Sequence, residues 1–169
     1  MYYLGYREKL LSQRALRRPP LPLQNRPPRL HNHRRTLLMI LSKYIIYVED
    51  DPDDVLLLRE AFADIDGYDL LVLGNGAELL RYLDGTIHLP SLIILDINMP
   101  VLNGRETLKL LKQHPVFSGI PVVMFSTSGM ASEVLFVSAY KTDLVVKPYD
   151  FHSLRYTVRH LVSYAVKAG

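Results

Sequence analysis

Short apolar runs alternate with longer amphipathic segments from residue 43 onward. The apolar runs have the length of strands and cover residues 44–48, 69–73, 91–95, 121–125 and 144–146. Between and after them, apolar positions recur at helical spacing, which predicts helices over residues 52–66, 76–84, 104–114, 131–140 and 150–166. Five strands alternating with five helices predict an α/β fold, a doubly wound five-stranded parallel sheet.

The same periodicity predicts which helical residues face the core. The inward positions are Val55, Leu56, Leu58, Phe62 and Ile65 in the first helix, Leu108 and Leu111 in the third, and Leu154, Val158, Leu161 and Ala165 in the last. Gly67 is expected to end the first helix and Pro115 the third.

Chemically active side chains follow four of the predicted strands. Glu49 and Asp50 follow the first strand, Asp96 the third, Ser126 the fourth and Lys147 the fifth. The carboxyl ends of parallel strands meet at one edge of a sheet, where α/β folds bind ligands. We therefore expect these side chains to gather around Asp96.

Clustered carboxylates repel one another unless a cation lies between them. Mg²⁺ suits such a site because it takes one or two carboxylates, keeps several waters and binds phosphate oxygens. The chemistry implied is phosphoryl transfer onto a carboxylate.

Ordinary structural roles remain open for three of these residues. Asp96 could simply start a turn, Lys147 could be a solvated surface lysine, and a hydroxyl among residues 126–128 could cap the next helix. The register of that Ser-Thr-Ser run is also open by one residue.

The acidic run after the first strand divides into two parts. Asp51 precedes Pro52, and Asp53 and Asp54 fall in the first helical turn, so we assign these acids mainly to capping and to the helix dipole. Glu49 and Asp50 lie before the cap, and for them we favour metal binding.

As a set, these motifs resemble the receiver domain of two-component response regulators over residues 43–167. They are the acidic pair, the run Asp96-Ile97-Asn98-Met99-Pro100, the hydroxyl after the fourth strand and the pair Lys147-Pro148. The resemblance implies a flavodoxin-like fold with strand order 2-1-3-4-5.

The resemblance also implies a role for each site residue. Asp96 would be the phospho-accepting nucleophile, while Glu49 and Asp50 would hold Mg²⁺ together with Asp96 and the backbone carbonyl of Asn98. Ser126 would hydrogen-bond a phosphoryl oxygen, and Lys147 would pair with its charge.

The resemblance further implies partners and a switch. The donor would be a sensor histidine kinase or a histidine phosphotransfer protein. The bond before Pro148 is typically cis in the family, and an aromatic residue that reports the switch often lies two or three positions before the lysine. Leu144 occupies that position here, and Tyr140 would replace the aromatic only if a shortened loop brings it across.

Two other function classes are weighed. A phosphatase of the haloacid dehalogenase type needs a second Asp two residues after the first, and this chain has Asn98 there. A phosphorylation-independent interaction module with the receiver fold is the alternative that remains. Gly74-Asn75-Gly76 lacks the third glycine of a dinucleotide fingerprint, so nucleotide binding is weaker still.

Residues 1–42 differ in kind from residues 43–169, which form the predicted receiver domain. The first segment has nine basic residues and one acidic residue, a net charge of +8, whereas the remainder has 11 basic and 16 acidic residues, a net charge of −5. Prolines prevent regular structure over its middle, although residues 4–18 could form a short basic helix. We expect a disordered extension, or an upstream translation ahead of a start at Met39, rather than a nucleic-acid-binding or membrane-binding arm.

Composition agrees with one α/β domain in the cytoplasm. The chain has no Cys, and no apolar run approaches the roughly 20 residues of a membrane helix. Nothing but three residues follows the last helix, so we expect the output to be a contact with a partner protein. By analogy, a homodimer through the last helices is considered.

Overall fold

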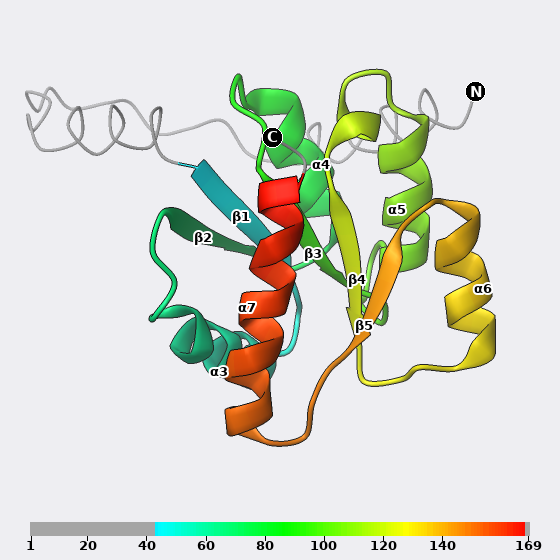
Figure 1. Ribbon diagram of the computed structural model, residues 1–169. Helices are drawn as coiled ribbons and strands as arrows, with labels where there is room; N and C mark the ends of the chain where they lie inside the picture. Colours follow the sequence, from blue (N-terminus) through cyan, green and yellow to red (C-terminus); the bar gives the residue numbers. More distant parts are fainter. Residues whose placement is uncertain (1–42, 168–169) are drawn as a thin grey trace, which may run out of the picture. The chain divides into compact units, whose positions relative to one another are not determined.

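One parallel sheet forms the centre of the computed structural model, which describes residues 43–167. Its strands run in the order β2-β1-β3-β4-β5 (Figure 1). Their bounds are β1 Lys43–Val48, β2 Tyr68–Leu73, β3 Leu92–Asp96, β4 Val122–Ser126 and β5 Asp143–Val146. The predicted fold class and strand order are confirmed.

Helices cover both faces of the sheet, with α3 and α7 on one face and α4, α5 and α6 on the other (Figure 1). Their bounds are α3 Pro52–Phe62, α4 Gly76–Gly85, α5 Gly104–Gln113, α6 Ala131–Ala139 and α7 Phe151–Lys167. A short 3₁₀ helix, Phe117–Gly119, precedes β4. Each crossover between successive strands carries one α-helix, the usual connection between parallel strands.

The central strands are apolar because both of their faces are covered. All five residues of β3 and all five of β4 are buried. On the α3 and α7 side, Tyr47 and Phe125 pack with Leu58 and Val158 in one cluster. The inward positions predicted for the third and last helices are all buried.

The first helix departs from the prediction at its end and on one face. It ends at Phe62 rather than near residue 66, because the amide of Ile65 turns back to the carbonyl of Phe62 and brings Ile65 against the core. Gly67, with φ of 84°, lies in the turn before β2. Leu56 is 64% exposed, since two residues of helix rotate it away from the buried Leu58.

Within residues 43–167, no helix has the length and apolar character needed to cross a bilayer. The basic segment of residues 1–42 lies outside the described residues, so the predictions made for it stay predictions.

Candidate functional site

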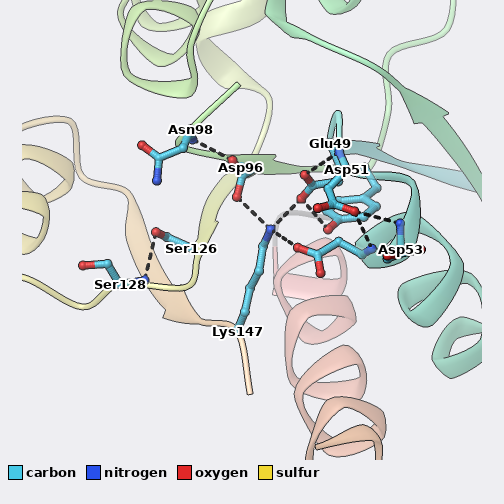
Figure 2. Close-up of polar contacts among 10 residues, drawn as sticks. Glu49, Asp51, Asp53, Asp96, Asn98, Ser126, Ser128 and Lys147 are labelled. Carbon is cyan, nitrogen blue, oxygen red and sulfur yellow. Dashed lines mark hydrogen bonds and ion pairs between the residues drawn. The ribbon is translucent and has the colours of Figure 1, made fainter. Parts of the chain in front are cut away.

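Four strand ends bring the predicted side chains to one edge of the sheet. Glu49 directly follows β1, Asp96 ends β3, Ser126 ends β4 and Lys147 directly follows β5. All four residues are buried, with exposed fractions of 4, 5, 0 and 9% respectively. Figure 2 shows the Lys147 side chain extending toward Asp96 and the acidic residues. The parallel register therefore assembles the cluster expected from the sequence.

Lys147 is held by three carboxylates. Its Nζ atom lies 2.5 Å from Oε2 of Glu49, 2.8 Å from Oδ1 of Asp96 and 2.7 Å from Oδ2 of Asp54. Burial alone would lower the pKa of Lys147, but the hydrogen bonds to Asp54, Asp96 and Glu49 outweigh it and raise the pKa above its ordinary value. The alternative of a solvated surface lysine is wrong.

Both carboxylate oxygens of Asp96 have partners. Oδ1 pairs with Lys147, and Oδ2 accepts a hydrogen bond of 2.6 Å from the backbone amide of Asn98. The second contact belongs to the turn that an Asp commonly starts, so this residue combines a turn-forming role with a place in the charged cluster.

The backbone around Asp96 is fixed by the start of α5. The amide of Gly104 donates to the carbonyl of Ile97 at 3.0 Å, and a Cβ at Gly104 would overlap the carbonyl oxygen of Asp96. Only glycine lets the helix begin this close to the strand end.

Glu49 accepts three hydrogen bonds. Its Oε1 accepts from the amide of Asp51 at 3.1 Å, and its Oε2 accepts from the Tyr47 hydroxyl at 2.8 Å and from Lys147. Burial raises the pKa of Glu49, and the bonds from Lys147 and Asp51 oppose this only in part. Burial and the neighbouring charge of Glu49 raise the pKa of Tyr47, which keeps its hydroxyl a donor.

Tyr47 was not among the predicted site residues. It lies two residues before Glu49, and alternate strand residues point to the same face, so the period of two was the signal available. Asp54 was assigned mainly to helix capping and the dipole; it does lie in the first turn of α3, but its carboxylate also binds Lys147. No sequence pattern shows which way a first-turn side chain will point.

Asp51 caps α3, as predicted. Its Oδ1 accepts from the amides of Asp53 and Asp54 at 2.8 and 3.4 Å. Its carboxylate is thereby directed at the helix N-terminus (Figure 2).

Three carboxylates are placed where they could hold a cation. One oxygen each from Glu49, Asp50 and Asp96 lies within 4.8 Å of the other two. Hard oxygen donors at this spacing fit Mg²⁺, and the exposed Asp50 leaves a side open to the waters that Mg²⁺ retains. Glu49, Asp50 and Asp96 are thus the residues that would hold such an ion.

Ser126 does not cap α6. Its buried Oγ accepts from the amide of Ser128 at 3.2 Å, and Ser128 Oγ accepts from the amide of Met130 at 3.3 Å. The N-cap residue of α6 is Met130, which makes no side-chain capping bond. The capping alternative is therefore wrong for Ser126.

Two features implied by the resemblance differ here. No cis peptide bond occurs within residues 43–167, so the bond before Pro148 is trans. With this trans bond the Lys147 side chain still points inward, where three carboxylates bind its ammonium group. Tyr140, the C-cap residue of α6, packs against Phe136 of that helix, with ring centroids 5.2 Å apart, and Leu144 is half-buried.

Comparison with known proteins agrees with this geometry. The family model of the response regulator receiver domain matches residues 45–159, and the chain belongs to that family. Response regulator Rcp1 of Synechocystis is 36% identical over 117 residues, which cover 65% of this chain and 71% of that protein. The regulator CpxR of Escherichia coli K12 is 32% identical over 120 residues, covering 70% of this chain and 48% of CpxR, so the match spans about half of that relative.

Solved structures show the same architecture. The phosphorylated cyanobacterial phytochrome response regulator RcpA matches with a TM-score of 0.69 at 27% identity, covering 76% of this chain and 96% of that one. The Mn²⁺-bound form of Rcp1 matches with a TM-score of 0.65 at 29% identity, covering 72% and 92%. The domain is accordingly a two-component signalling module rather than a conventional enzyme.

Proposed function

We propose that this receiver accepts a phosphoryl group on Asp96 from a phosphohistidine, with Mg²⁺ bound, and signals by changing a protein contact. The observation that carries the proposal is the Lys147 ammonium 2.8 Å from Asp96 within a cluster of buried carboxylates. A buried lysine paired with buried carboxylates is typical of sites that stabilise charge during a reaction, here at Asp96.

In the proposed step, a carboxylate oxygen of Asp96 attacks the phosphorus of the phosphohistidine. A new O–P bond forms, the N–P bond breaks, and the electron pair leaves with the histidine nitrogen. Lys147 would pair with the transferred phosphoryl group, Ser126 would donate its hydroxyl to a phosphoryl oxygen, and the amide of Asn98 holds the carboxylate in place.

Mg²⁺ would be held by Glu49, Asp50, Asp96 and the backbone carbonyl of Asn98. When bound, it neutralises negative charge on the transferring phosphoryl group. Lys147 already offsets part of the carboxylate charge at this edge of the sheet.

The proposed donor is a sensor histidine kinase or a histidine phosphotransfer protein in the cytoplasm. The sensor histidine kinase TmoS contains a stretch 28% identical to 70% of this chain, which is 12% of its own length. Two structural neighbours are named for light-sensing systems, RcpA for a cyanobacterial phytochrome and RPA3017 for red-light signalling. A phytochrome-type kinase is therefore the first class of donor to test.

The proposed output is a contact with another protein or with a second copy of this chain. In its support, apolar side chains stay exposed on α6 and at the end of β5: Val134, Leu135 and Val146 are 46, 73 and 47% exposed. Light scattering with and without a phosphodonor separates the two cases, because only a homodimer changes the mass of the purified protein.

Intact mass after incubation with Mg²⁺ and acetyl phosphate tests the proposal. We expect an acid-labile adduct of one phosphoryl group on the wild type and none on Asp96→Asn. Asp53→Asn is the matched control, since Asp53 is exposed and lies in the same acidic run. A folded wild-type protein that forms no adduct would favour the phosphorylation-independent interaction module instead.

A further inference from the structure

One buried carboxylate in residues 43–167 lies outside the site and is incompletely paired. Oε2 of Glu133 has no hydrogen-bond partner, and the side chain is only 4% exposed. Its other oxygen lies 3.8 Å from Nη2 of Arg105, which is beyond hydrogen-bond distance. Burying a carboxylate that is incompletely paired costs free energy. A shorter distance between Glu133 and Arg105 would lower that cost.

Arg105 is tied to the backbone of Asp96. It is the second residue of α5 and follows Gly104, whose amide donates to the carbonyl of Ile97 and whose Cα packs against the carbonyl of Asp96. The position of Arg105 therefore depends on β3, the strand that ends in Asp96, the proposed phosphoryl acceptor.

Glu133 is tied to the end of the neighbouring strand. It lies in the first turn of α6, and a short relay of hydrogen bonds leads there from Ser126. The Ser126 hydroxyl accepts from the amide of Ser128, and the Ser128 hydroxyl accepts from the amide of Met130, the N-cap residue. Two hydrogen bonds thus connect Ser126 to the start of α6.

Helix α6 is held by few buried side chains. Only Glu133 and Val137 of its nine residues are buried. Phe136 faces α5, with Arg105 and Lys109 lying 5.1 and 5.7 Å from its ring centroid. An element with so little buried apolar area is among the easiest in a domain to displace.

We propose that Arg105 and Glu133 are positioning residues whose ion pair closes when Asp96 is phosphorylated, drawing the first turn of α6 toward α5. The inference rests on the proposed function, in which Ser126 donates to a phosphoryl oxygen on Asp96. Movement of Ser126 toward Asp96 carries Glu133 toward Arg105, which then supplies the missing hydrogen bonds. Leu144 has no aromatic ring with which to report phosphorylation of Asp96. The Arg105–Glu133 ion pair reports it instead.

A double-mutant cycle in the full chain tests this coupling. The variants are Glu133→Gln, Arg105→Gln and the double variant, and the measurement is the affinity for beryllofluoride, an aspartyl-phosphate mimic, in the presence of Mg²⁺. Each single variant should weaken the affinity about five-fold or more, as expected for allosteric coupling, and the double variant should weaken it no further. Glu106→Gln removes an exposed carboxylate from the first turn of α5 and should leave the affinity unchanged.

Hydrogen exchange of residues 131–139 provides the second readout. Beryllofluoride should slow exchange in the wild type but not in Glu133→Gln or Arg105→Gln. Urea unfolding with Mg²⁺ alone checks that each variant is folded. If Glu133→Gln folds poorly, Arg105→Gln still provides the test, because Arg105 is partly exposed.

The outcomes separate the two proposals. Suppose that the wild type forms an acetyl phosphate adduct and binds beryllofluoride, that both single variants bind it equally well, and that α6 responds in them as in the wild type. The proposed closure of the Arg105–Glu133 ion pair is then overturned, and the proposed function stands. If the wild type forms no adduct and binds no beryllofluoride, both the proposed function and the closure of this ion pair fail.

Discussion

Lys147 reaches Asp96 across an intervening strand. The residue follows β5, whereas Asp96 ends β3, and β4 lies between them in the sheet. The ammonium lies 5.7 Å from the ring centroid of Phe125 in β4 and 2.8 Å from Oδ1 of Asp96. One flexible side chain thus joins three strand ends, counting its contact with Glu49 after β1.

Removing this cation should destabilise the protein. In Lys147→Met, the buried charges of Glu49 and Asp96 lose their cationic partner, and breaking such a pair costs about 3–5 kcal/mol of unfolding free energy. Urea unfolding at neutral pH without Mg²⁺ measures the loss. Lys43→Met, at an exposed lysine, should change the free energy by less than about 0.5 kcal/mol. Equal losses in the two variants would mean that the lysine does not compensate these carboxylates.

Asp50 should matter for Mg²⁺ and little for the metal-free fold. It is exposed, whereas the other two members of the acidic cluster are buried. At Mg²⁺ ten times above its dissociation constant, binding to the native state should stabilise the wild type by about 1.4 kcal/mol. Asp50→Asn should show wild-type unfolding without Mg²⁺ and a smaller gain with it. Asp53→Asn should retain the full gain, and a full gain in Asp50→Asn would remove Asp50 from the metal site.

Most of the fold, and the gathering of Glu49, Asp96 and Lys147 at one edge of the sheet, could be predicted from the residues that follow the apolar runs. Each apolar run had the length of one strand, and four of the five were followed by a polar side chain that the parallel sheet brings to the common edge. Asp96, Glu49 and Lys147 all met this condition and do lie together.

The errors came from side-chain direction and from competing tertiary contacts. Asp54 had an adequate local explanation as a first-turn acid, yet it also turns toward Lys147. Leu56 fitted an apolar helical pattern, yet the buried face of α3 is set by Leu58 and Phe62. The Arg105–Glu133 contact joins two helices whose packing no single-chain periodicity describes.

Asp51 should contribute stability and not phosphorylation. Its carboxylate accepts the amides of Asp53 and Asp54 and so caps α3. Asp51→Ala should lose about 1 kcal/mol of unfolding free energy, while Asp51→Ser should recover most of it because serine also caps helices. Both variants should form the phosphate adduct with acetyl phosphate and Mg²⁺. An adduct missing from a folded Asp51→Ser protein would instead give this carboxylate a part in the transfer.

Gly104 should be intolerant of even one methyl group. A Cβ there would overlap the carbonyl oxygen of Asp96, and backbone atoms on both sides of the contact have little freedom to move. We expect Gly104→Ala to lose about 3 kcal/mol or more, at the upper end of the cost of overpacking. In Gly119→Ala nothing lies within 4 Å of the new Cβ, and the change should be neutral or stabilising by about 0.4–1 kcal/mol. Because the same contact positions the acceptor, Gly104→Ala should also slow adduct formation under conditions where it remains folded. Wild-type stability and phosphorylation in this variant would show that α5 can begin farther from Asp96 than the structure has it.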